Sequence, residues 1–201
     1  MTNPYKLLIE HLACDNSYSI INQTIFEAGF EDLGYIFNIY DKFKFSKYYG
    51  IEQINENEMF VSFILEDGSI DNVSGGGSAY DIYSKYLKET KNSNAFKEEH
   101  FKELFDLRFQ TNIEEYIYSN NLFNPQFNIG IFNKLFHRLD HRNKPIEILK
   151  WFKKNSIPNA LVLFSVNIKD KSTFYNQTHN LDIPKYVYSN NEIDELINSV
   201  N

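Results

Sequence analysis

The chain has 201 residues and a mass of 23.8 kDa, and its 20 Lys and Arg residues against 27 Asp and Glu residues give a formal net charge of −7. Hydrophobic residues make up 42% and aromatic residues 16% of the chain, more than a disordered chain carries. With 8 Gly, 5 Pro and 1 Cys, the composition also excludes collagen-like chains and disulfide-rich scaffolds. The sequence therefore predicts a folded globular protein.

Neither a leader peptide nor a membrane helix is predicted. The apolar run at 7–9 is too short for the core of a signal peptide. The longest uncharged apolar stretch, between Lys154 and Lys169, is shorter than the roughly 20 residues that a membrane helix needs. The lone Cys14 fits a reducing compartment. These features predict a cytoplasmic protein.

The first third of the chain is predicted to contain two short helices followed by strands. The helices are expected over 5–13 and 18–28, and Gly29 would end the second. From residue 34 onwards, apolar side chains fall on alternate positions, which indicates strands: Phe37, Ile39, Phe43 and Phe45, then an extended piece over 48–54, then Met59, Val61, Phe63 and Leu65. Asp67-Gly68 suits a hairpin turn before a returning strand over 70–73. Residues 34–73 are therefore predicted as an antiparallel β-meander.

The rest of the chain is predicted to be mainly helical, with one strong strand. Helices are expected from about residue 79, over 95–109 and 112–120, around the apolar stripe of 132–139, and from Pro145 to about 155. The run over 160–168 predicts a strand buried on both faces, and 186–188 a second short strand. Ser189 and Glu192 form a capping box before a last helix.

This element order predicts an α+β fold. We expect an antiparallel β-meander flanked by helices, with a C-terminal helix–strand–strand–helix segment. One domain is predicted over 1–201, with a candidate sub-boundary at the polar stretch 88–96.

Two motifs suggest ligand sites. The loop Gly75-Gly76-Gly77-Ser78, between a predicted strand and helix, offers backbone amides to a phosphate; it lacks the G-x-G-x-x-G and P-loop patterns, so a capped connector is the alternative interpretation. His137, Asp140 and His141 have the spacing of a metal site and resemble the H-x-x-E-H pattern with Asp in place of Glu. A polar helix end is the alternative interpretation of that motif.

Tyrosines and acidic residues recur through the predicted meander and the helix after it. Tyr is favoured at interfaces because it buries a large ring and keeps a polar tip, and acidic neighbours complement a basic partner. The predicted partner-binding residues are Tyr35, Tyr40, Tyr48, Tyr49, Glu52, Glu56, Glu58, Tyr80, Asp81 and Tyr83. The alternative interpretation is that these rings fill an ordinary core.

In size, acidic charge and lack of a catalytic motif, the chain resembles the immunity proteins of bacterial polymorphic and contact-dependent toxins. The resemblance implies stoichiometric binding of a basic toxin domain, no enzymatic activity and no cofactor. The alternative is an enzyme that acts on a nucleotide or nucleic acid, using the glycine loop, the His137 cluster or the basic segment 134–154. A homodimer is a third possibility for the partner.

Overall fold

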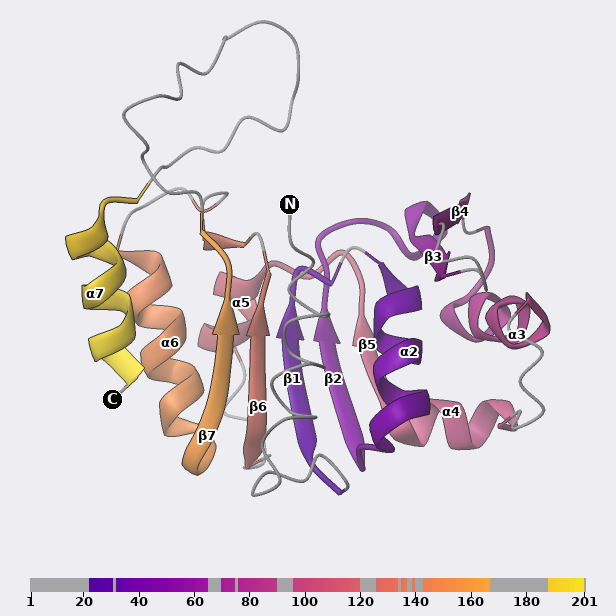
Figure 1. Cartoon of the computed structure of the whole chain (residues 1–201), viewed down its shortest axis with the longest axis horizontal. Coiled ribbons are helices and arrows are strands. Elements are labelled where there is room, and N and C mark those ends of the chain that lie inside the picture. Colours follow the sequence, from indigo (N-terminus) through magenta and orange to yellow (C-terminus); the bar gives the residue numbers. More distant parts are fainter. Residues whose placement is uncertain are drawn as a thin grey trace, which may run out of the picture.

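The computed structural model describes residues 22–30, 32–64, 70–74, 76–89, 96–119, 126–133, 135–136, 139, 143–166 and 188–200. At its centre lies a five-stranded sheet in the order β5-β2-β1-β6-β7, in which all neighbouring strands are parallel (Figure 1). These strands are β1 (Thr24–Ala28), β2 (Lys47–Ile51), β5 (Phe105–Arg108), β6 (Phe127–Phe132) and β7 (Ser156–Phe164). The predicted α+β fold with a β-meander is therefore wrong: the chain has an α/β fold with a parallel sheet.

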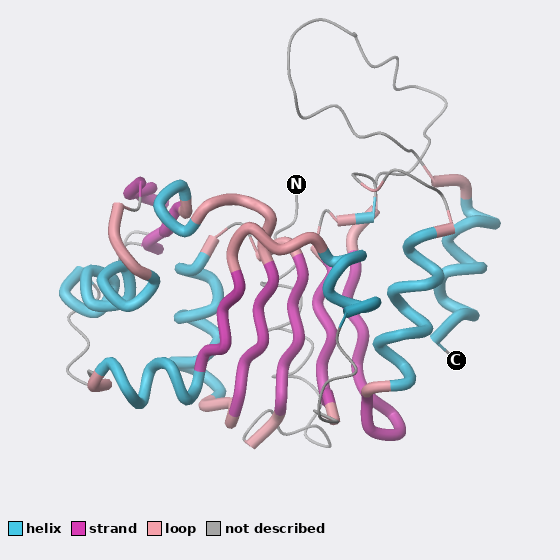
Figure 2. The backbone as a smooth tube through the Cα atoms, turned by 180° about the vertical axis from the view of Figure 1, so that it is seen from behind, coloured by secondary structure: helices cyan, strands magenta, loops and turns pink. Residues whose placement is uncertain are grey.

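Helices and buried side chains cover both faces of the sheet, as a parallel sheet requires. One core includes side chains of α2 (Leu33–Phe43), α3 (Ala79–Glu89) and α4 (Glu98–Leu104). The other includes side chains of α5 (Ile113–Ser119), α6 (Lys144–Lys154) and α7 (Asn190–Val200). Figure 1 shows α2 in front of the sheet, and Figure 2, from behind, shows α5 on the opposite face.

The first predicted strand is in fact helix α2. Leu33, Ile36 and Phe37 are fully buried, and their spacing matches one face of a helix. The carboxylate of Asp32 caps the helix by accepting a 2.8 Å hydrogen bond from the backbone N–H of Gly34. The N-cap and the buried helical face stabilise a helix here, although apolar residues also fall on alternate positions as in a strand.

The predicted helix over 18–28 is wrong in its described part, where 24–28 form strand β1. This strand lies between β2 and β6 and is buried on both faces, so it lacks the alternation that identifies a half-exposed strand. Ile25 packs in one core, whereas Phe26 and Ala28 pack in the other. Residues 5–13 and 18–21 lie outside the described part of the chain.

Several other predictions are confirmed. The extended piece predicted over 48–54 overlaps β2, which ends at Ile51 and has parallel neighbours. β3 (Phe60–Ile64) and β4 (Ile70–Ser74) form an antiparallel pair beside the main sheet, preceded by the short 3-10 helix η1 (Glu56–Glu58); their turn, with Asp67-Gly68, lies outside the described residues. Helices α3, α5, α6 and α7 are present, and the amide of Ser189 donates to Glu192 over 2.8 Å as its capping box requires.

Three predictions for the second half need correction. The helix expected over 95–109 ends at Leu104, and 105–108 form strand β5 instead. Phe132 ends strand β6 and begins no helix. β7 is an edge strand whose residues are half-buried or exposed, so it is not covered on both faces. Residues 167 and 168 of that predicted strand, like 186 and 187 of the next, lie outside the described part.

Within the described part of the chain, no helix is long and apolar enough to cross a membrane.

Candidate functional site at the carboxyl edge of the sheet

The strand order places a topological switch point between β1 and β6. The chain leaves β1 toward β2 and β5, and leaves β6 toward β7 on the other side. In open α/β sheets, ligands bind in the crevice that this divergence creates at the carboxyl ends of the strands. That edge is at the top of Figure 1, where the arrowheads of β1, β2, β6 and β7 point. The residues that follow each strand there form the candidate site.

Gly29 ends β1 in a conformation that other residues rarely adopt. Its φ is +78°, in the left-handed region. Its amide donates a 2.9 Å hydrogen bond to the carbonyl of Ile51, at the end of β2. A Cβ on Gly29 would lie 3.6 Å from the carbonyl oxygen of Asn133, which follows β6. The backbones on the two sides of the switch point thus approach each other closely at Gly29.

The α2 N-terminus, next along the chain, carries a negative charge. Asp32 is its N-cap, and the Asp32 side chain accepts a hydrogen bond from the amide of Gly34. A helix N-terminus that binds a phosphate needs free amides and a positive local field. Here an acidic side chain already accepts a hydrogen bond from one of these amides, and Glu31 precedes it in the sequence. This turn therefore favours a ligand without phosphate groups.

Glu52 follows β2 directly, and only 7% of it is exposed. Its Oε1 accepts hydrogen bonds from the amides of Gln53, at 2.7 Å, and Ile54, at 3.4 Å. These amides hold the carboxylate at the strand end and offset part of the cost of burying it. A carboxylate at this point, about 20 residues after a glycine turn, is the group that binds ribose hydroxyls in dinucleotide-binding folds.

The chain after β5 forms the next wall of this edge. The amide of Glu52 donates to the carbonyl of Arg108, and the amide of Thr111 donates to the carbonyl of Glu52, both at 2.9 Å. Gln110 donates to the carbonyl of Ile54 at 3.2 Å with a φ of 51°. Residues 108–111 are thereby fixed beside the segment that carries Glu52.

On the other side of the switch point, two polar side chains meet above β6 and β7. The hydroxyl of Ser165 donates a 2.8 Å hydrogen bond to Oδ1 of Asn133, and the amide of Ser165 donates to the carbonyl of Phe132 at 3.3 Å. These bonds orient the Asn133 side chain at the edge where the ligand crevice is expected. Sequence reasoning missed Gly29, Asp32 and Asn133, although a glycine turn followed by an acidic residue was a usable signal.

The predicted partner-binding tyrosines do not form one surface. Tyr48 and Tyr83 are buried, at 2% and 1% exposure, within the first core. Tyr49 packs against the core on the opposite face of the sheet, and burial raises the pKa of its hydroxyl. The remaining tyrosines of the set are half-buried against the first core: Tyr35, Tyr40 and Tyr80. Tyr48 and Tyr83 therefore fill the core, as the alternative interpretation expects, and partner binding by the half-buried tyrosines stays a prediction.

The acidic members of that set are spread along one segment and one helix. Glu52 is buried at the sheet edge, Glu56 and Glu58 lie in η1, and Asp81 lies in the first turn of α3. Glu58 and Asp81 are exposed and Glu56 is half-buried.

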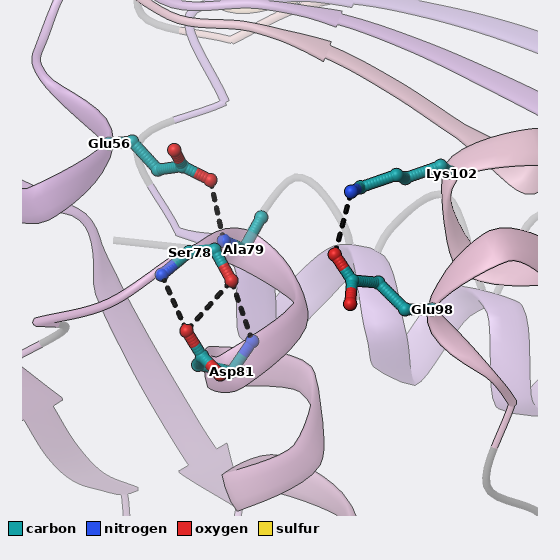
Figure 3. Close-up of polar contacts among 6 residues, drawn as sticks. All are labelled: Glu56, Ser78, Ala79, Asp81, Glu98 and Lys102. Carbon is teal, nitrogen blue, oxygen red and sulfur yellow. Dashed lines mark hydrogen bonds and ion pairs between the residues drawn. The ribbon is translucent and has the colours of Figure 1, made fainter.

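The glycine loop leads into α3, and carboxylates already accept hydrogen bonds from the amides of Ser78 and Ala79 (Figure 3). Asp81 accepts hydrogen bonds from the amide of Ser78, at 2.9 Å, and from its hydroxyl, at 2.8 Å. The amide of Ala79 donates to Oε1 of Glu56 at 2.6 Å. Gly76 and Gly77 have φ values of +95° and +129°, whereas Gly75 lies outside the described residues. A phosphate would have to displace these carboxylates, so phosphate binding here stays a prediction.

The predicted metal ligands His137, Asp140 and His141 all lie outside the described part of the chain. Among the residues that are described, no three His, Cys, Asp or Glu side chains gather as a metal site would require.

Comparisons with known proteins found similar solved structures. No family model and no curated protein matches the chain. It is similar to an O-methyltransferase family 2 protein from Planctomyces limnophilus in complex with apigenin, with 10% identity, a TM-score of 0.48, and coverage of 98% of this chain and 55% of the other. It is also similar to human N-acetylserotonin methyltransferase in complex with SAM, with 10% identity, a TM-score of 0.38, and coverage of 88% of this chain and 39% of the other. A third similar structure is PKMT2 from Rickettsia typhi, with 13% identity, a TM-score of 0.42, and coverage of 83% of this chain and 25% of the other. PKMT2 also has a structure with AdoHcy. The chain spans between a quarter and about half of the length of these structures.

The predicted resemblance to toxin immunity proteins, and with it toxin neutralisation as the function, is wrong. The β-meander that was expected to carry the docking face is absent from the described residues, which form a parallel sheet instead. The expected docking face is also dispersed, because Tyr48 and Tyr83 are inside the protein. The enzyme alternative, a basic partner and a homodimer stay predictions.

Proposed function

We propose that this chain binds S-adenosylmethionine (SAM) at the carboxyl edge of its sheet and serves as the cofactor-binding domain of a methyltransferase. The observation that carries the proposal is the position of Glu52, a buried carboxylate at the end of β2 beside the Gly29 turn. In a doubly wound sheet this arrangement binds the ribose of a nucleoside.

The acidic N-terminus of α2 restricts which nucleoside-containing ligands the site can bind. Asp32 at the α2 N-terminus disfavours a diphosphate, which argues against dinucleotides and nucleoside triphosphates. SAM contains a nucleoside, lacks phosphate and carries a positive sulfonium, so the negative field of Asp32 and Glu52 favours it. When bound, SAM supplies an electrophilic methyl group on that sulfonium.

The residues of this chain would hold and orient the ligand. Glu52 would accept hydrogen bonds from the ribose hydroxyls, and Gly29 would let the backbone approach the ligand without a Cβ in the way. Asn133, fixed by Ser165, would present an amide at the crevice on the β6 side.

Isothermal titration calorimetry with AdoHcy, the demethylated product of SAM, tests the proposal directly. We expect AdoHcy to bind the whole chain, and NAD and ATP to bind at least tenfold more weakly. Glu52→Gln should weaken AdoHcy binding roughly tenfold or more, as loss of charge-assisted hydrogen bonds does. Glu58→Gln removes an exposed carboxylate from the same segment and should leave the affinity unchanged. Tighter binding of ATP or NAD than of AdoHcy, or equal effects of the two substitutions, would contradict the proposal.

A further inference from the structure

A cavity lies between α3, α4 and β5. Its volume is about 280 Å³, close to the smallest size that holds a small molecule. Its apolar lining comes from α4 and from one face of β5 and the residue after it: Phe101, Phe105, Leu107 and Phe109. Phe109 also contacts Phe30 of the β1–α2 turn, with ring centroids 5.7 Å apart. The cavity therefore lies beside the proposed nucleoside site but is lined by other residues.

Three charged side chains stand at the rim of this cavity: Glu56 from η1, and Glu98 and Lys102 from α4 (Figure 3). The ammonium of Lys102 pairs with Oε1 of Glu98 at 2.6 Å, one helical turn away. This hydrogen bond and the charge of Glu98 raise the pKa of Lys102. Lys102 therefore stays positive, and the charges of Glu99 and Glu56 also raise its pKa.

The carboxylates of Glu56 and Glu98 outnumber the one ammonium, that of Lys102, so the cavity lining carries a net negative charge. Oε1 of Glu56 accepts the hydrogen bond from the amide of Ala79 at 2.6 Å, which fixes the carboxylate over the cavity. Its other oxygen has no hydrogen bond to any described residue, and Glu56 is only half-exposed. The helix N-terminus does not depend on this contact alone, because Ser78 and Asp81 already form a capping box there.

We propose that this cavity binds a small primary amine with a flat apolar body. The ammonium would lie against the second oxygen of Glu56, and the apolar body against Phe101, Leu107 and Phe109. Charge complementarity selects the amine over a carboxylic acid of the same shape, because the rim carries two carboxylates and one ammonium. The inference does not depend on SAM binding, since Glu52 is not among the residues that line the cavity.

Binding of 2-phenylethylamine to the whole chain, measured by calorimetry and by shifts of backbone amide resonances, tests this proposal. Two probes of the same shape serve as comparisons: 2-phenylethanol, which is neutral, and phenylacetate, which is negative. We expect the amine to bind best and phenylacetate worst, and we expect the amide resonances of Ala79 and Leu107 to shift.

Glu56→Gln keeps an oxygen that can accept the hydrogen bond from Ala79 but removes the charge. It should weaken amine binding about tenfold and leave 2-phenylethanol binding unchanged. Glu58→Gln, two residues away in η1, should change neither. The proposal is overturned if phenylacetate binds as tightly as the amine, if both substitutions act alike, or if the resonance shifts fall outside the cavity. AdoHcy titrations of the same samples keep a failure here distinct from a failure of the proposed function.

Discussion

The hydroxyl of Tyr48 donates a 2.7 Å hydrogen bond to Oε2 of Glu27, and both side chains are almost fully buried. Glu27 lies in the central strand β1 and Tyr48 in its neighbour β2. A buried carboxylate is stable only when hydrogen-bond donors surround it. Tyr48 therefore stabilises a charged or polar group next to the Gly29 turn, besides filling the core with its ring.

Replacing Tyr48 with Phe should destabilise the protein. The ring remains, but a buried acceptor loses a donor, and hydrogen bonds to carboxylates contribute about 1.5–3 kcal/mol. Urea denaturation should show a loss of that size in the free energy of unfolding. Tyr118→Phe is the matched control: its hydroxyl also donates to a carboxylate, that of Glu147, but 67% of the side chain is exposed. Equal losses in the two variants would show that burial is not the cause.

Gly130 in β6 should not tolerate even a methyl group. A Cβ there would lie 2.7 Å from the ring of Phe152, which packs directly on the strand backbone. Overpacking of this kind costs about 1–3 kcal/mol, so Gly130→Ala should lower the free energy of unfolding by that amount. When Phe152 is already replaced by Leu, the Gly130→Ala substitution should lower the free energy of unfolding by less than it does in the natural chain. Strictly additive effects in this double-mutant cycle would argue against a clash between the two side chains.

Gly29 and Gly76 allow a ligand-binding role to be separated from backbone strain. Both have positive φ, at +78° and +95°. Ala at either position should cost about 1–2 kcal/mol of stability because of its Cβ. We expect only Gly29→Ala to weaken AdoHcy binding, measured by calorimetry at a temperature where both variants are folded. If Gly76→Ala weakens binding equally, the Gly29 turn has no specific role in the site.

The cap of α3 should give stability that depends on pH. The Ser78 hydroxyl and amide donate to Asp81, and Lys85 is nearby, so the pKa of Asp81 lies below its ordinary value of 3.8. A carboxylate with a lowered pKa stabilises the fold at pH values above its unfolded pKa, and that contribution is lost as the pH falls through the folded pKa. Asp81→Asn should therefore lower the urea midpoint at pH 7, and the difference from the natural chain should vanish in strong acid. The same pH dependence in Glu58→Gln would instead indicate a general effect of net charge.

Features determined by neighbours in sequence were predictable. The Ser189–Glu192 box and the Pro145 helix start were confirmed because a cap or a proline acts within one turn of the chain. The β3–β4 pair was also confirmed, since antiparallel strands close in sequence share one short connection.

The parallel sheet was not predictable in this way. Its register joins distant residues, such as Ile25 with Ile129, and nothing local specifies that partner. β1 has Glu27 among apolar residues, which imitates an amphipathic helix, whereas α2 shows a chance alternation of apolar residues. Once the strand order was read wrongly, the switch point could not be located. Glu52 was singled out, but for a docking role, because its place at the end of β2 only has meaning within the parallel sheet.

The connection between β2 and β5 has a consequence for how such a chain can change. In the described part of the chain it contains η1, the β3–β4 pair, α3 and α4, whereas the described connection between β6 and β7 contains the single α-helix α6. β2 and β5 are immediate neighbours, so their pairing does not depend on the length of what joins them. The side chains of this connection complete the first core, among them Met59, Tyr83 and Phe101, so any replacement for it must cover the same face of the sheet.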